Sequence, residues 1–225
     1  MPSVLLCDVN ETLLDLRALD PVFAGLFGDP ATRREWFGQM LQSALVATLT
    51  DAYADFGAAG MAALAMVAER RGVALTEDGR QAVRQGMRTL PAYPEVRDAL
   101  ARLRDVGFRL AALTNSTAEV AEAQLAHAGI RDLFEAALSA DSVRRLKPAP
   151  EPYRMAAERM GVPIGDTRLI AAHAWDVAGA QRAGAAAAFV ARPGMVLDPL
   201  APRPDVIGAD LTEVAARIIA LDRSP

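Results

Sequence analysis

An acid and a hydroxyl, Asp8 and Thr12, follow directly after a short apolar run at residues 4–7. A continuous apolar run of this length is typical of a buried parallel strand. In an open α/β sheet, ligands bind just outside the carboxyl ends of the strands, so Asp8 is a candidate for chemistry. An Asp at this point could equally open a turn or cap a helix, and this stretch alone does not decide between the two roles.

Three more groups of polar residues follow apolar runs later in the chain. They are Thr114, Asn115 and Ser116, then Lys147, and finally His173 with Asp176. Each has an ordinary structural explanation, as a helix cap, a solvated loop residue or a hydrogen-bonded core histidine. Their occurrence after successive strands is harder to explain in that way, because the carboxyl ends of parallel strands meet at one crevice. We therefore expect these groups to form a single site.

Apolar strand patterns and helical patterns alternate from residue 95 to the end of the chain, which predicts a parallel sheet with helical crossovers. The expected strands are residues 4–7, 108–113, 135–139, 168–172, 186–190 and, more weakly, 206–207. The helices expected between them are 95–106, 117 to Gly129, 150–160, a segment ending at Gly184, and 211–221. The core is thus predicted to be a doubly wound α/β fold.

The segment between residues 14 and 90 contains no strand pattern. Its expected helices are residues 17–28, 31–56, 58–71 and 77–88. In the second of these, Trp36, Phe37 and Met40 are interpreted mainly as core residues, with one of them a candidate for lining a substrate site. We predict an inserted helical cap at residues 15–90, and an α/β catalytic core formed by residues 1–14 and 91–225.

Composition excludes several classes of function. The formal net charge is −4, so no basic surface for nucleic acid is expected. No secretion signal is recognised, and no apolar run approaches the roughly 20 residues that span a bilayer. The single cysteine, Cys7, is interpreted as a buried apolar residue in a reducing compartment. These features predict a cytoplasmic protein that binds neither nucleic acid nor membrane.

Four short motifs occur in a fixed order along the chain. They are Asp8-Val9-Asn10-Glu11-Thr12-Leu13, Leu113-Thr114-Asn115-Ser116, Lys147-Pro148 and Ala174-Trp175-Asp176. With the cap after the first motif, they resemble the motif set of the haloacid dehalogenase superfamily over essentially the whole chain. Tyr153, six residues after Lys147, and Gly179-Ala180 after the fourth motif are similar to the type II (L-2-)haloacid dehalogenases.

The resemblance implies hydrolytic, metal-independent dehalogenation of a short 2-haloalkanoate on a Rossmann-like core, with water as co-substrate, no cofactor and a homodimeric assembly. It implies that Asp8 is the nucleophile and forms an ester with the substrate carbon. Thr12 and Lys147 would hold Asp8 ionised and oriented, and Asp176 would orient Lys147 and the hydrolytic water. The residues expected to bind substrate are Asn10, Gln39, Thr114, Asn115, Tyr153 and Trp175.

Two positions separate this chain from the phosphatases of the same superfamily. Asn10 stands where the phosphatases carry a second Asp as acid/base, and an amide cannot transfer that proton. Ala172 stands where a further Mg²⁺ ligand is common, and Asp8 with Asp176 alone offers too few oxygen atoms. A Mg²⁺-dependent phosphatase is therefore the second hypothesis. A third is a member that binds a small carboxylate, or a protein, without turnover.

Other positions depart from the type II pattern. An aromatic residue and Gly are usual where Asn10 and Glu11 stand, and Glu11 has no assigned role. An ungapped placement puts Gln39 where that family has a cap arginine for the carboxylate or the halide, with Arg33 or Arg34 as alternatives. Three roles are open for His173. It can be a hydrogen-bonded core histidine, a donor to the leaving halide, which would suit a halide as small as fluoride, or a base for the ester-cleaving water.

Overall fold

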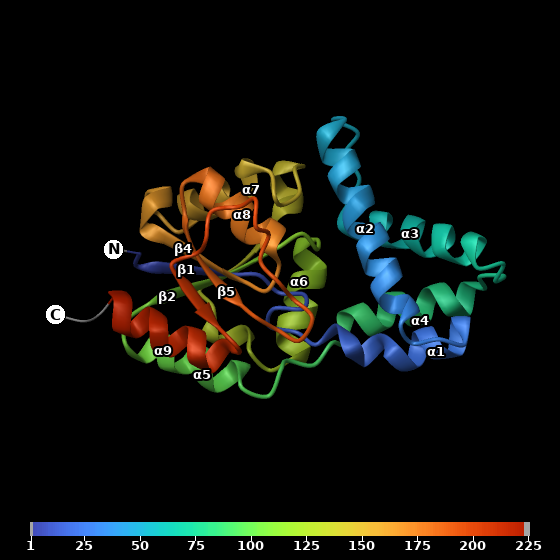
Figure 1. Ribbon diagram of the computed structural model, residues 1–225, viewed down its shortest axis with the longest axis horizontal. Coiled ribbons are helices and arrows are strands. Elements are labelled where there is room, and N and C mark those ends of the chain that lie inside the picture. Colours follow the sequence, from blue (N-terminus) through green and yellow to red (C-terminus); the bar gives the residue numbers. More distant parts are fainter. Residues whose placement is uncertain (1, 223–225) are drawn as a thin grey trace.

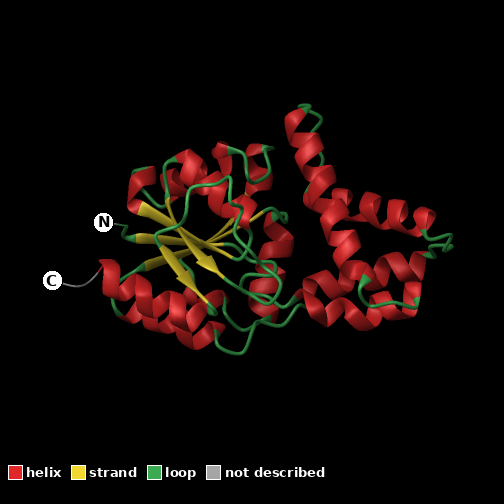
Figure 2. Ribbon diagram, viewed as in Figure 1, coloured by secondary structure: helices red, strands yellow, loops and turns green. Residues whose placement is uncertain are grey.

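A sheet of six parallel strands occupies the centre of the protein in the computed structural model, which describes residues 2–222 (Figures 1 and 2). The strands are β1 (Val4–Cys7), β2 (Arg109–Thr114), β3 (Ala136–Ser139), β4 (Thr167–Ala171), β5 (Ala186–Val190) and β6 (Val206–Gly208). Their order is β3-β2-β1-β4-β5-β6, which confirms the doubly wound prediction. The order reverses between β1 and β4, and such a switch point is where this fold forms its ligand crevice.

Helices cover both faces of this sheet. They are α5 (Val96–Asp105), α6 (Ala118–His127), α7 (Pro150–Arg159), α8 (Ala174–Ala183) and α9 (Leu211–Asp222). Figure 1 shows α7 and α8 on one side of the sheet and α5 and α9 on the other. Strand β1 is buried from both sides: Val4 and Leu6 belong to one apolar cluster, Leu5 and Cys7 to the other. The continuous apolar run of β1 is thus explained by burial on both faces.

A separate group of helices lies to one side of the sheet (Figure 1). It consists of α1 (Asp20–Phe27), α2 (Thr32–Leu49), α3 (Phe56–Arg70) and α4 (Glu77–Arg88). The indole N–H of Trp36 donates to the carbonyl oxygen of Gly60 at 2.8 Å and so joins α2 to α3. The two connections to the core run side by side, because Leu14 and Ala92 form an antiparallel bridge. The exact division at residues 14/15 and 90/91 stays a proposal.

The expected single helix at residues 31–56 is correct as far as Leu49 and wrong for residues 50–55. Helix α2 ends at Leu49, and α3 begins only at Phe56. Between them Asp51 has φ 57°, a left-handed conformation that ends a helix. Asp55 then caps α3 by accepting a hydrogen bond from the Ala58 backbone N–H at 2.9 Å. The apolar pattern of α2 continues to Leu49 at the exposed end of the helix, so periodicity alone did not locate the break.

Short 3-10 segments connect the longer helices and strands. The segments are Leu16–Leu19, Arg131–Leu133, Ala140–Val143 and Ile164–Asp166. The expected helix at residues 17–28 is therefore a 3-10 turn followed by α1, which ends at Gly28 with φ 72°. Among residues 2–222, no helix has the length and apolar character required to cross a membrane.

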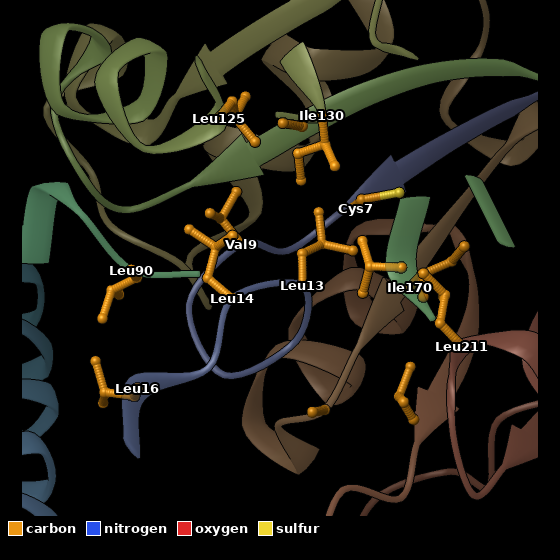
Figure 3. Packing of buried hydrophobic residues seen from close by; sticks show 14 of the residues in the cluster. Cys7, Val9, Leu13, Leu14, Leu16, Leu90, Leu125, Ile130, Ile170 and Leu211 are labelled. Atoms are coloured by element: carbon orange, nitrogen blue, oxygen red, sulfur yellow. The ribbon is translucent and has the colours of Figure 1, made fainter. Parts of the chain in front are cut away.

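The loop after β1 is anchored by its own apolar side chains. Val9, Leu13 and Leu14 are fully buried, and Figure 3 shows them near Leu90, which precedes the second connection to the core. The backbone N–H groups of Leu13 and Leu14 both donate to the Val9 carbonyl, at 2.9 and 3.0 Å. These buried side chains and hydrogen bonds keep the loop in one conformation, so the polar residues Asp8 and Thr12 have fixed positions.

Helix α8 packs so closely on the loop after Lys147 that only glycine fits at position 179. A Cβ there would lie 2.6 Å from the Pro148 Cβ and 2.7 Å from the Tyr153 hydroxyl oxygen. We expect Gly179→Ala to lower the free energy of unfolding by about 1–3 kcal/mol in urea denaturation. Gly25→Ala in α1 is the matched control, because a Cβ there meets no atom within 4 Å. Equal stability of the two variants would contradict this account.

Candidate active site

The loop after β1 delivers a carboxylate and the hydroxyl that holds it. The Asp8 backbone N–H donates to the Ile170 carbonyl at 3.0 Å, which ties the end of β1 to β4. Thr12 Oγ1 donates to Asp8 Oδ2 at 2.6 Å and accepts from the Ala172 backbone N–H at 2.9 Å. Asp8 and Thr12 are both buried. The carboxylate therefore has a fixed orientation at the switch point between β1 and β4.

Lys147 is buried beside Asp8 and is fully hydrogen-bonded. Its Nζ donates to Asp8 Oδ1 at 2.8 Å, to Asp176 Oδ2 at 2.6 Å and to the Leu113 carbonyl at 2.9 Å. Burial lowers the pKa of Lys147, but the charges of Asp176 and Asp8 outweigh burial and raise it. Burial likewise raises the pKa of Asp8, but Lys147 and His173 outweigh it and hold that pKa well below its usual range. Asp8 is thus ionised at neutral pH.

Asp176 lies in the first turn of α8 and accepts two hydrogen bonds. One comes from Lys147, and the other comes from the hydroxyl of Tyr153, which donates to Asp176 Oδ1. Burial, with a contribution from the Asp8 charge, raises the pKa of Asp176 despite Lys147. Tyr153 is fully buried behind Asp176 and does not line the cavity over Asp8. The structure therefore places Tyr153 against Asp176, rather than against a substrate as the sequence predicted.

Amide side chains brace the same strand ends. Asn115 Oδ1 accepts from the Lys147 backbone N–H at 2.8 Å, and Asn115 Nδ2 donates to the Lys147 carbonyl at 3.3 Å. Asn10 Nδ2 donates to Ser116 Oγ at 3.4 Å, and Asn10 Oδ1 accepts from Gln124 at 3.0 Å. Asn115 thus holds the loop that carries Lys147. Gln124, which no motif or pattern in the sequence singles out, holds Asn10.

His173 follows β4 and faces Asp8 and Glu11. Its Nε2 is 3.0 Å from Glu11 Oε2, and its Nδ1 is 3.4 Å from Asp8 Oδ2. The ring lies between Phe37 and Trp175, with centroid distances of 6.0 and 5.2 Å. Burial lowers the pKa of His173, but the two carboxylates outweigh burial and raise it to about 9. His173 is therefore a cation at neutral pH, and an imidazolium can donate protons but cannot act as a base.

A small cavity lies over Asp8 at the contact of core and cap. It is lined by Asp8, Asn10, Phe37, Leu41, Phe56, Thr114, Asn115, Lys147, His173 and Trp175. Its volume of about 10 Å³ is room for roughly one water molecule. The strand ends are thus brought together as predicted, and the apolar cap residues above them must move before even a small substrate enters.

Gln39 is not brought to this cavity. It lies on the opposite face of α2 from Phe37 and Leu41, two residues away, and its side-chain amide bonds to Gln42 and Arg70. Two positions correspond to about 200° around a helix, so a placement two residues in error exchanges one face for the other. Arg33 and Arg34 line a neighbouring cleft that shares His173 and Trp175 with the cavity. The α2 residues over Asp8 are therefore apolar.

Sequence reasoning gave no role to Leu41, Phe56 or Glu11, and the structure places all three near Asp8. The i, i+4 spacing of Phe37 and Leu41 could have indicated a shared helix face. Glu11 contacts a residue 162 positions away, and nothing local in the sequence identifies that partner. Among residues 2–222, no group of three or more His, Cys, Asp or Glu side chains is arranged to hold a metal ion.

This chain matches the model of one protein family and resembles several known enzymes. The family model described as a haloacid dehalogenase-like hydrolase matches residues 2–184. The (S)-2-haloacid dehalogenase 2 of Pseudomonas sp. strain CBS-3 is 30% identical over 92% of this chain and 91% of its own length. The haloacetate dehalogenase H-2 of Moraxella sp. strain B is 30% identical over 76% of each chain.

Solved structures agree with these relatives. The L-2-haloacid dehalogenase from Xanthobacter autotrophicus, with chloropropionic acid covalently bound, has a TM-score of 0.90 at 25% identity. The similarity covers 98% of this chain and 99% of the Xanthobacter chain. The L-2-haloacid dehalogenase RSc1362 has a TM-score of 0.92 at 25% identity, covering 96% and 98% of the two chains. The likeness therefore extends over both the core and the cap.

Proposed function

The chain belongs to the haloacid dehalogenase-like hydrolase family, and we propose that it hydrolyses a short 2-haloalkanoate to the 2-hydroxy acid through an ester on Asp8. The observation that carries this proposal is the buried arrangement of Asp8, Lys147 and Asp176, in which Lys147 bonds to both carboxylates. Relatives named for 2-haloacids and haloacetate support the substrate class. A structure with covalently bound chloropropionic acid supports the ester.

In the first step, an Asp8 oxygen attacks the carbon that bears the halogen. A carbon–oxygen bond forms, the carbon–halogen bond breaks, and the electron pair leaves with the halide. Lys147 and Thr12 each hold one oxygen of Asp8, at 2.8 and 2.6 Å, so the nucleophile needs no reorientation. The hydroxyl of Thr114 and the amide of Asn115, which line the cavity, are the proposed donors to the substrate carboxylate.

The departing halide needs hydrogen-bond donors, and two face this region. Among the described residues, His173 Nδ1 and Trp175 Nε1 are buried and have no hydrogen-bond partner. Because His173 is charged, its Nδ1–H can make a charge-assisted hydrogen bond, which is stronger than a neutral one. Of the roles open from the sequence, the geometry and charge favour the donor to halide over the base for water.

In the second step, water attacks the carboxyl carbon of Asp8. Asp176 accepts one water proton and returns it to the alkoxide oxygen as the acyl–oxygen bond of the ester breaks, so that the hydroxy acid leaves. The second water proton is lost to solvent when Asp8 ionises again. A raised pKa suits Asp176 to this transfer, because a base works best when its pKa approaches the working pH. The oxygen that joins the product therefore comes from Asp8, and the water oxygen remains on Asp8.

The two alternatives have weaker support. Asn10 bonds to Ser116 and Gln124, and neither its amide nor these partners supplies the acid/base group that a phosphatase needs. The named relatives also favour dehalogenation over phosphate transfer. A non-catalytic role would leave the well-held Asp8 carboxylate without a use.

We expect the purified protein to release halide from chloroacetate, bromoacetate, fluoroacetate or 2-chloropropionate, with the hydroxy acid formed in equal amount. No step of the proposed reaction requires a metal ion, so we expect a chelator to leave the rate unchanged. Ion chromatography of halide, with and without EDTA, measures both. Mg²⁺-dependent release of phosphate from a phosphorylated metabolite would favour the phosphatase. No release of halide or phosphate from any substrate would contradict both enzyme proposals.

Two finer statements remain proposals. A homodimer is supported by exposed apolar residues on α2, where Val46 and Leu49 are 54% and 81% exposed. Light scattering that gave the mass of one chain would contradict it. A cytoplasmic location is supported by Cys7, the single cysteine, which is free and leaves the chain without an internal disulfide, as is usual in a reducing compartment. Cell fractionation tests that location.

A further inference from the structure

Glu11 has two unusual properties that the reaction described above does not use. Its φ is 62°, a left-handed conformation that is unfavourable for a side chain larger than glycine or asparagine. Its carboxylate is also largely buried, with 14% of the side chain exposed, and it contacts two cationic side chains, His173 and Arg33. Strain of this kind persists where the surrounding contacts enforce it, and it is found most often at functional sites.

The contacts of His173 show what Glu11 does to the ring. Glu11 Oε2 is 3.0 Å from Nε2, which fixes that nitrogen as a donor to the carboxylate. The other nitrogen, Nδ1, is 3.4 Å from Asp8 Oδ2, is buried, and has no hydrogen-bond partner among the described residues. Phe37 and Trp175 flank the ring and restrict its rotation. One nitrogen is therefore held, and the other is presented to the cavity over Asp8.

We propose that Glu11 is a positioning residue that keeps His173 cationic and turns its Nδ1–H toward the reacting carbon, where it stabilises the departing halide. This proposal rests on the proposed dehalogenase function and deepens it. Glu11 touches neither substrate nor Asp8 and acts only through His173. The α2 residues over the cavity, Phe37 and Leu41, carry no charge. The positive charge for the halide thus comes from the core strand end.

Arg33 braces Glu11 from the cap. Its Nη1 is 3.4 Å from Glu11 Oε1, and its Nε donates to Asp20 Oδ1 at 2.5 Å. The Arg33 side chain is only 4% exposed, so these partners neutralise an otherwise unpaired buried charge. Because Arg33 belongs to α2 and Glu11 to the loop after β1, this ion pair joins the cap to the carboxylate that orients His173.

His173 lies among charged groups of both signs. The titratable and charged groups that line the cavity over Asp8 or the neighbouring cleft are Asp8, Glu11, Arg17, Arg33, Arg34, Tyr93, Lys147 and Arg192, and Asp176 lies behind Lys147. Of these, Asp8 and Glu11 are in direct contact with the ring and raise the pKa of His173 to about 9. The imidazolium is present below that pH and is lost above it. Removal of the Glu11 charge lowers this pKa, because one of the two stabilising carboxylates disappears.

The class of substrate that benefits most is a fluoroacid. Fluoride is a small ion and a strong hydrogen-bond acceptor, so the breaking of a carbon–fluorine bond depends more on a charged donor than does the loss of bromide. If Glu11 maintains that donor, its replacement slows defluorination more than debromination. A residue with only a structural role would slow both to the same degree.

The first test follows protonation directly and needs no catalysis. The chain has two histidines, His127 and His173, so ¹⁵N NMR of histidine-labelled protein gives two titrating side chains. The signal that disappears in His127→Asn belongs to His127. We expect His173 to titrate near pH 9 in the wild type and at least about one pH unit lower in Glu11→Gln. Titration at the same pH in both proteins would overturn the proposal.

The second test measures kcat against pH with fluoroacetate and bromoacetate. We expect Glu11→Gln to lower kcat for fluoroacetate about fivefold or more at pH 9, because a pKa lower by about one unit leaves roughly a tenth of His173 protonated there, against about half in the wild type. The effect on bromoacetate is smaller, and the alkaline limb moves to lower pH. Glu11→Asp, which keeps the charge, restores part of both. If Glu11→Gln fails to fold, the wild-type NMR titration still decides, because a His173 pKa near the ordinary histidine value would overturn the proposal. Glu35→Gln is the control, since Glu35 pairs with Arg70 and Arg71 instead.

The two tests separate the possible failures. A shifted titration with unchanged kcat and pH profile in Glu11→Gln would overturn the halide role. Absence of halide release by the wild type from every substrate would overturn the proposed function, and the halide role with it. In that case the NMR titration still tests whether Glu11 raises the pKa of His173.

Discussion

Asp8→Asn is expected to reduce the rate of halide release by at least about four orders of magnitude. Asparagine keeps the shape of the side chain and can still accept a hydrogen bond from Lys147, but a neutral amide is a very poor nucleophile toward carbon. The loss therefore falls on the chemical step rather than on folding. Halide release measured by ion chromatography, together with the urea midpoint of both proteins, separates the two effects.

Asp15→Asn is the matched control for this variant. It makes the same chemical change seven residues later, where Asp15 pairs with Arg17 at the surface and is remote from the cavity. A single turnover in ¹⁸O-water with excess enzyme adds a positive test. The ester route puts an Asp8 oxygen into the first hydroxy acid, so that product is unlabelled and later turnovers carry label. Full label in the first turnover would show direct attack by water and rule out Asp8 as the nucleophile.

Lys147→Met is expected to lower the activity by at least about 10³-fold and the free energy of unfolding by about 3–5 kcal/mol at pH 8. It leaves two buried carboxylates, Asp8 and Asp176, close together without the cation that bonds to both. In the wild type, Lys147 helps to hold the pKa of Asp8 low, so its contribution is present at neutral pH and is lost as pH falls. Urea unfolding at pH 8 and pH 5 measures the difference.

The pH dependence distinguishes this explanation from a simple packing defect. Protonation of a carboxylate relieves the repulsion in Lys147→Met, so the gap in stability to the wild type should narrow at pH 5. An equal gap at both pH values would contradict the electrostatic explanation. Arg145→Met in the same loop is the control. Its ion pair with Asp51 is partly exposed, and a change within about 1 kcal/mol is expected.

The parts of the fold that follow from local pattern were predictable. Strand β1 is a continuous apolar run because both of its faces are buried, and the alternation of strands and helices after residue 95 led to the observed parallel sheet. The meeting of Asp8, Lys147 and Asp176 then follows from strand direction alone. Their catalytic roles stay predictions, because geometry shows proximity and charge but not turnover.

The predicted residue positions that differ from the structure depend on which face of a helix a residue occupies, or on contacts between residues distant in the sequence. Gln39 was placed over Asp8, but an error of two residues on a helix turns a side chain to the other face, and Phe37 lies there instead. The resemblance predicts Tyr153 in the substrate pocket from its spacing to Lys147. Its actual position beside Asp176 depends on how α7 packs on α8, which that spacing does not specify. The contact between Glu11 and His173 joins two loops far apart in the chain, and no periodicity encodes it.

The chain contains 24 lysines and arginines, and Lys147 is the only lysine among them. Lys147 is buried and its amine donates to three acceptors, so it cannot react while the core and cap are in contact. Acylation by an amine-directed reagent therefore has one side-chain target besides the terminal amine. The rate of that labelling measures how often the protein opens, and a substrate analogue that closes the cavity would slow it.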